Sequence, residues 1–151
     1  MKHFINLIGK IIHIAKDFKS YDGINLNNRY MCILAIEDSN FLLIPMSTFH
    51  SKQEKQKKLA YPTNFEYSKI HGNTKDSYLK CDQIYVLSFD DFNKFREIQT
   101  KHKMDLNYFM KLRTHVENLH REKKTKIFQK QLIFEDQERI AENEFSSESE
   151  R

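Results

Sequence analysis

The sequence lacks the features that mark membrane-spanning, disulfide-stabilised and zinc-binding proteins. None of its apolar runs approaches the roughly 20 residues that a transmembrane helix needs, which excludes such a helix. Its two cysteines, Cys32 and Cys81, lie far apart and outside any CxxC motif, so neither a disulfide framework nor a zinc signature is present. The first residues carry no signal-peptide pattern. We therefore expect a soluble, cytoplasmic protein that does not act at a membrane.

The common catalytic signatures are missing as well. The sequence contains no P-loop, no GxGxxG, no GxSxG and no HExxH motif. Their absence excludes the nucleotide triphosphatases, the dinucleotide-dependent enzymes, the hydrolases with a nucleophile elbow and the zincins. We expect the protein to use neither a cofactor nor a metal ion.

The composition nevertheless favours a folded domain. The length of 151 residues suits one domain with its own core, and the apolar content of 39% includes 12 Phe and 7 Tyr. Large aromatic side chains stabilise a fold strongly when they are buried. The chain is therefore expected to fold rather than to be disordered throughout.

The net charge of +4 hides two regions of opposite sign. Residues 135–151 hold seven acidic and two basic residues, a charge of −5, which leaves +9 for residues 1–134. A basic, aromatic-rich body is typical of proteins that bind nucleic acid. The acidic tail is either a solvated, disordered segment or a cover that folds back over the basic residues 52–58.

The first half of the chain is predicted to form short strands. β-Branched and aromatic residues dominate several short runs that are separated by turn-forming residues. Strands are predicted at 9–14, 30–36, 41–46, 64–70 and 78–87, the second and third as a hairpin buried on both faces. Pro45 marks its strand as an edge strand or one that ends there. Polar surface loops are predicted at 17–28 and 51–58.

The second half is predicted to be helical. Apolar residues at three-residue spacing suggest a short helix at 90–99 capped by Asp90 or Asp91, and Asp105 is a good N-cap for a longer helix at 105–120. That helix would bury one stripe, made of Leu106, Phe109, Leu112, Val116 and Leu119. The sequence thus predicts a mainly β domain over 1–121, a small barrel closed by a C-terminal helix, followed by a charged extension over 122–151.

Polar residues at two predicted strand ends are the first candidates for a site. Arg29 immediately precedes one apolar strand, and Ser47 and Thr48 follow another. Neighbouring strand ends meet at one rim of a small barrel, and a guanidinium beside two hydroxyls suits a phosphate. The alternative is that Arg29 is a solvated loop residue and that Ser47 and Thr48 form a turn or a helix cap.

Two further segments could bind nucleic acid. Strand alternation would place Lys80 and Asp82 on one face of the strand at 78–87, and the Gln83 amide can pair with base edges. Lys52 and Lys55 belong to the basic loop. Each segment could instead be an ordinary solvated face. His13 and His50 are candidates for acid–base chemistry, and the alternative is that neither has a catalytic role.

In order along the chain, these features resemble the MazF/PemK family of toxin endoribonucleases. The matching elements are Gly9-Lys10-Ile11, Asn28-Arg29-Tyr30, Pro45-Met46-Ser47-Thr48, Pro62-Thr63, Lys75-Asp76-Ser77 and Asp82-Gln83-Ile84, with the helix at 105–120. ToxN-like toxins, which an RNA inhibits, share the strand that ends in Pro-x-Ser/Thr. The sequence departs from the pattern at Tyr30, where a proline is usual, and in the order of Ser47 and Thr48.

The resemblance implies both a fold and an activity. The fold would be an SH3-like barrel of the MazF/PemK/Kid type that works as a homodimer. The protein would be the toxin of a toxin–antitoxin system, an endoribonuclease that cleaves single-stranded mRNA without a metal, by attack of the ribose 2′-hydroxyl. Its partner would be an antitoxin, either a protein or, in a ToxN-like case, an RNA.

The resemblance also assigns roles to residues. Arg29 would stabilise the transition-state phosphate, Ser47 and Thr48 would hold its oxygens, and the RNA would lie against Lys80, Asp82 and Gln83, with Lys52 and Lys55 on the basic loop nearby. The loop at 17–28 contains no histidine, so the general acid and base are not identified. The alternative function is a non-catalytic, nucleic-acid-binding module built on the same small barrel.

Overall fold

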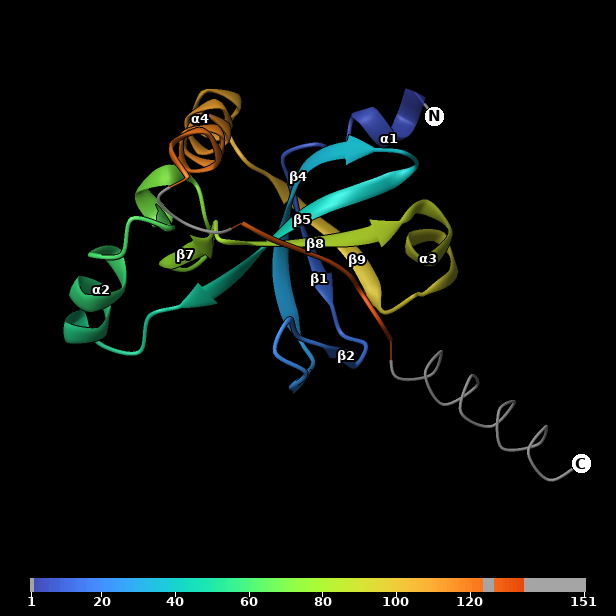
Figure 1. Ribbon diagram of the computed structural model, residues 1–151, viewed down its shortest axis with the longest axis horizontal. Coiled ribbons are helices and arrows are strands. Elements are labelled where there is room, and N and C mark those ends of the chain that lie inside the picture. The colour runs from blue at the N-terminus through green and yellow to red at the C-terminus, as the bar shows by residue number, and fades with distance from the viewer. Residues whose placement is uncertain (1, 124–126, 135–151) are drawn as a thin grey trace, which may run out of the picture.

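Eight strands form one mixed sheet in the computed structural model, which describes residues 2–123 and 127–134 (Figure 1). Six of the strands run across it in the order β10-β8-β5-β4-β1-β9, and β7 and β6 continue it from β5 as a side branch. The bounds are β1 Lys10–Ile14, β4 Arg29–Glu37, β5 Asn40–Thr48, β6 Asn64–Tyr67, β7 Ser77–Lys80, β8 Gln83–Ser88, β9 Ile98–Lys103 and β10 Phe128–Gln131. The prediction of a mainly β protein with a C-terminal helix is confirmed.

The hairpin of β4 and β5 lies at the centre of the sheet and is buried on both faces, as its continuous apolar runs predicted. Side chains alternate between the two faces of a strand, and here each face meets its own core. Met31 and Ile33 belong to one core, whereas Cys32 and Leu34 belong to the other. Asp38 and Ser39 form the turn between the strands with positive φ angles.

The two cores are covered by different helices. Helix α4 (Leu106–Glu122) buries Phe109, Leu112, Val116 and Leu119 against the core that contains Cys32. Its predicted N-cap is confirmed, since the Asp105 carboxylate accepts a hydrogen bond from the Tyr108 N–H, although Leu106 is exposed. Helices α1 (Lys2–Ile5) and α3 (Phe89–Lys94) contribute Phe4 and Phe89 to the other core. No helix of the described residues is long and apolar enough to cross a membrane.

The predicted barrel does not close within the described residues. The path of six strands ends at β9 on one side and at β10 on the other. Along the sheet β5 changes partner, because its residues 40–43 pair with β8 and its last three residues pair with β7. The sheet therefore forks at β5, and α4 covers one core without closing a barrel.

Two strand predictions need correction. The strand predicted at 78–87 is two strands, β7 and β8, separated by a turn at Cys81 and Asp82. The strand predicted at 64–70 ends at Tyr67, and a short 3-10 helix, η1 (Lys69–His71), follows. In both cases an apolar run crosses a turn without a proline or a glycine to mark it.

Two helix predictions also need correction. The loop predicted at 51–58 is a helix, α2 (Lys52–Leu59), with Ser51 as its N-cap. It buries no residue and so has no apolar stripe, but Lys, Gln and Glu are good helix formers. The helix predicted at 90–99 is only α3, capped by Ser88 rather than by Asp90 or Asp91, and Ile98 already belongs to β9.

The core continues past residue 121, where the sequence interpretation ended the compact domain. Strand β10 pairs in parallel with β8, and Leu132 and Phe134 are fully buried. A backbone bridge joins Phe134 to Phe18 in the predicted surface loop, which contains the short strands β2 (Phe18–Lys19) and β3 (Asn25–Leu26). The acidic tail at 135–151 and its suggested role lie outside the described residues.

Candidate functional site

The fork of the sheet leaves a cavity of about 790 Å³ at the place where β4 and β5 separate. Its wall comes from the ends of β4 and β5, from the loop that holds β2 and β3, and from parts of β7, β8 and β9. Five of the eight predicted site residues line it: Arg29, Ser47, Thr48, Lys80 and Gln83. The structure thus brings together residues that lie up to 54 positions apart, from Arg29 to Gln83.

The strand register explains why these residues meet. Arg29 and Ser47 both lie two residues beyond the Met31–Pro45 pair, so they project from the same face of the sheet. The registers of β5 with β7 and with β8, continued to Pro45, bring both Lys80 and Gln83 next to the Pro45 position, on that face too. Thr48 pairs with Ser77 and belongs to the opposite face. A cation, a hydroxyl, a second cation and an amide therefore share one surface.

The other three predicted residues lie outside the cavity wall. Asp82 lies in the turn after β7, so it does not share a strand face with Lys80 as the alternation predicted. Lys52 is exposed on α2. Lys55 forms an ion pair with Glu66, with 3.2 Å between Nζ and Oε2. The basic segment at 52–58 is therefore a helix beside the site.

Of the two predicted cations in the cavity wall, Arg29 and Lys80, Lys80 is the more buried. Burial lowers the pKa of its ammonium group, and the positive charges of Lys58 and Arg29 lower it further, while Asp82 and Asp22 act in the opposite direction. The Arg29 charge thus acts against the charged form of Lys80, although burial is the larger cause of its lowered pKa. An anion between them would relieve this repulsion, which is the electrostatic pattern of a phosphate site.

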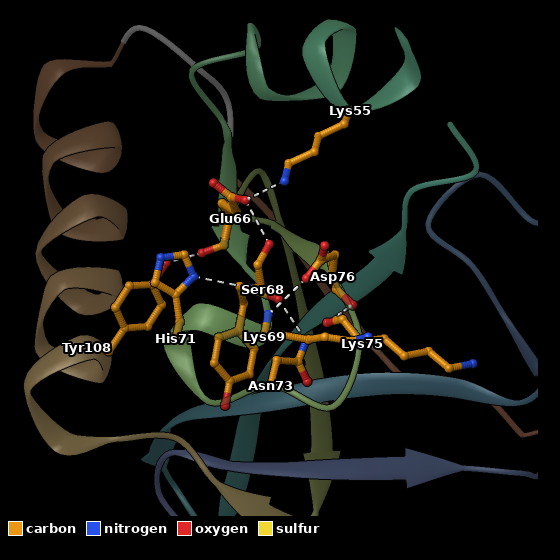
Figure 2. A network of polar contacts seen from close by, with 11 residues as sticks. Lys55, Glu66, Ser68, Lys69, His71, Asn73, Lys75, Asp76 and Tyr108 are labelled. Carbon is orange, nitrogen blue, oxygen red and sulfur yellow. Dashed lines mark hydrogen bonds and ion pairs between the residues drawn. The ribbon is translucent and has the colours of Figure 1, made fainter. Parts of the chain in front are cut away.

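A polar network holds one wall of the cavity in place (Figure 2). The Ser68 hydroxyl donates to Glu66 at 2.7 Å, which is the main cause of the lowered pKa of that carboxyl, and the Ser68 N–H donates to Nδ1 of His71 at 3.0 Å. His71 stacks on Tyr108 of α4, with 4.3 Å between ring centroids. Buried Asn73 donates to the Tyr67 carbonyl at 2.7 Å. The network fixes the segment that brings Asn73, Thr74 and Lys75 to the cavity wall.

Two histidines line the cavity. His50 is exposed after β5, and His102 lies on β9 with its Nε2 2.8 Å from the Tyr67 hydroxyl. Burial lowers the pKa of His102, which favours the neutral imidazole, and burial raises the pKa of Tyr67 to about 12. His13 lies outside the cavity wall and packs at a tilt against Tyr30. Sequence reasoning missed His102 because its strand follows a segment that was assigned to a helix.

No protein-family model matches the sequence, and no curated protein matches it significantly. The resemblance described above therefore depends on the quoted motifs alone. Within residues 2–123 and 127–134, no group of three or more His, Cys, Asp or Glu side chains is arranged to hold a metal ion.

Proposed function

We propose that the protein is an endoribonuclease that cleaves single-stranded RNA at the cavity between β4 and β5. One observation carries this proposal: Arg29, Ser47, Lys80 and Gln83 come from four separate strands and line one face of one cavity. Such a face offers positive charge and a hydroxyl to a phosphate, and an amide to a base. The single-strand preference follows from the cavity, since a base must leave its stack to enter it.

The reaction is a phosphoryl transfer within the RNA, from the 5′-oxygen to the 2′-oxygen. The ribose 2′-oxygen attacks the adjacent phosphorus, the bond from phosphorus to the 5′-oxygen breaks, and the products are a 2′,3′-cyclic phosphate and a 5′-hydroxyl. Arg29 and Lys80 stabilise the negative charge that grows on the phosphoryl oxygens, and the Ser47 hydroxyl donates a hydrogen bond to one of them. The 2′-hydroxyl proton passes to a base, and a second proton goes to the leaving 5′-oxygen. His50 and His102 are the imidazoles in the cavity wall that can carry out such transfers.

The proposal extends to family and partners. The order of the motifs along the chain and their meeting in one cavity support kinship with the MazF/PemK toxins, whose SH3-like barrel would correspond to the forked sheet. A toxin of this kind works as a homodimer in the cytoplasm and is neutralised by an antitoxin, which is a protein or, in a ToxN-like case, an RNA.

Cleavage of a long single-stranded RNA in the presence of EDTA tests the activity directly. We expect fragments with 5′-hydroxyl and 2′,3′-cyclic phosphate ends, and we expect no cleavage of a DNA of the same sequence because DNA lacks the 2′-hydroxyl. Mapping the 5′ ends of the products shows whether, and where, the RNA and the DNA are cut. An intact, folded protein that leaves the RNA uncut, or that cuts the DNA equally well, contradicts the proposal. Salt-sensitive binding without cleavage would instead support the non-catalytic binding module.

A pH titration tests the role of Lys80. Because its pKa is lowered, its positive charge is lost at a lower pH than that of an ordinary lysine, so RNA affinity should begin to fall at a lower pH in the wild type than in Lys80→Arg, whose guanidinium stays charged. Anisotropy titrations across the alkaline range measure the difference. Lys103→Arg, on β9 outside the cavity wall, is the matched control and should follow the wild type. Identical profiles for the wild type and Lys80→Arg would show that Lys80 does not contact the RNA.

A further inference from the structure

Tyr21 is an exposed aromatic residue in the cavity wall. It lies at the tip of the turn between β2 and β3, and 44% of its surface is accessible to solvent. An exposed tyrosine in a turn is usually free to move. Several contacts with the core hold this one in place.

The first contacts fix the backbone of the turn. The Tyr21 N–H donates to the hydroxyl of Tyr85 at 2.8 Å, and Tyr85 belongs to the core with only 2% of its surface exposed. The preceding residue, Ser20, is buried, and its carbonyl accepts hydrogen bonds from the Gly23 N–H at 3.0 Å and from Nζ of Lys130 at 3.1 Å. Gly23 has a φ of +84°, a conformation that glycine adopts without strain.

The C-terminal segment supplies the remaining contacts. The Tyr21 ring packs at a tilt against Phe128 of β10, with 5.3 Å between centroids. The Lys19 N–H donates to the Ile133 carbonyl at 3.2 Å, next to the bridge between Phe18 and Phe134. The turn is therefore ordered by strand β10 and the residues that follow it. Because the folded core already fixes the turn, a ligand that stacks on Tyr21 loses little of its binding energy to ordering it.

Tyr21 is also connected to the predicted site. Tyr85, which holds its backbone, lies two residues from Gln83 on the same face of β8, and the Tyr85 hydroxyl lies 3.5 Å from Oε1 of Gln83. Arg29 and Ser47 project from that face as well. A nucleotide with its phosphate at Arg29 and Ser47 could therefore place its base, or the neighbouring one, toward Gln83 and Tyr21.

We propose that Tyr21 is the stacking platform for an unpaired nucleobase, with the Gln83 amide beside it to bind the edge of that base. Single-stranded nucleic acids are recognised in this way, because a base outside a duplex exposes both its face and its edge. The inference takes its ligand, a single strand, from the proposed function. It does not depend on cleavage.

A fluorescent base analogue provides the test. Short single-stranded oligonucleotides with 2′-O-methyl riboses cannot be cleaved by 2′-hydroxyl attack, and each carries 2-aminopurine at a different position. Full-length wild-type protein is expected to quench one position strongly, because stacking quenches this base. Tyr21→Leu should abolish that quenching and weaken binding about five- to hundredfold, whereas Tyr21→Phe should retain both because the ring and the backbone hydrogen bond remain.

The controls separate this inference from the proposed function. Tyr61→Leu removes a tyrosine that is 51% exposed outside the cavity wall, and it should behave as the wild type does. Thermal melting confirms that Tyr21→Leu is folded. Quenching or affinity that survives in Tyr21→Leu, a wild type that binds no single strand, or equal quenching of a duplex each overturns the inference. Quenching that depends on Tyr21 without any RNA cleavage upholds it while refuting the endoribonuclease, and cleavage without such quenching does the reverse.

Discussion

Arg29→Ala is expected to lower the rate of RNA cleavage by about two to three orders of magnitude, the usual cost of removing one donor from a preorganised oxyanion site. In the proposed site the guanidinium would offer two parallel donors where phosphoryl charge grows, and Arg29→Ala removes both of them. Arg29 is exposed at the start of β4, so the free energy of unfolding should change by less than about 0.5 kcal/mol. Single-turnover cleavage and urea denaturation measure the two effects separately.

Two variants serve as controls for Arg29→Ala. Arg96→Ala removes an exposed arginine outside the cavity wall and should cleave at the wild-type rate. Arg29→Lys keeps the charge but loses the planar fork, so it should recover only part of the rate. A rate that is equal in Arg29→Ala and in the wild type would refute the catalytic role of Arg29.

Arg29→Ala should also change the pKa of Lys80. The Arg29 charge contributes to the lowered pKa of Lys80, so its removal should raise that pKa toward the ordinary lysine value. The alkaline fall in RNA affinity should then move to higher pH in Arg29→Ala. An alkaline limb that stays where it is would show that the Arg29 charge does not act on Lys80.

The parts of the fold that were predicted correctly are those with a strong local pattern. The apolar runs of β4 and β5 and the stripe of α4 each repeat with the period of their own element, so neighbouring residues specify them. The prediction that Pro45 marks an edge strand or a strand end was wrong, because β5 lies between β8 and β4 inside the sheet. The strand continues to Thr48, but Pro45 lies next to the point where β5 exchanges its pairing for β7. A residue without an N–H is tolerated where the ladder changes partner.

The parts that were missed depend on contacts between distant segments. Nothing within residues 78–87 shows that Cys81 and Asp82 form a turn, because the turn arises when β7 and β8 pair with different portions of β5. The site follows the same logic. The candidate residues were found at strand ends, whereas Tyr21 and His102 reach the cavity only through the packing of β10 and β9, which no local pattern reveals.

Phe134→Ala is expected to destabilise the protein by about 3–5 kcal/mol, a large share of the roughly 5–15 kcal/mol that holds a domain of this kind together. Phe134 is completely buried, and its ring lies 4.8 Å from that of Phe95, centroid to centroid. Its removal leaves a cavity in the core that Ile33 and Leu43 share, and the surrounding strands can relax only in part. Urea denaturation followed by circular dichroism measures the loss as a lower midpoint.

The neighbouring residue supplies the matched control, because Ile133 is 40% exposed and Ile133→Ala removes apolar atoms that are only partly buried. Its midpoint should stay close to that of the wild type. The two variants together decide whether the residues after 121 belong to the core or form a charged extension, since an extension would make both substitutions equally harmless.

Because Phe134 bridges to Phe18 beside the turn that carries Tyr21, Phe134→Ala should also reduce the quenching at Tyr21 under conditions in which the variant remains folded. Unchanged stability in Phe134→Ala would return the C-terminal boundary of the domain to residue 121.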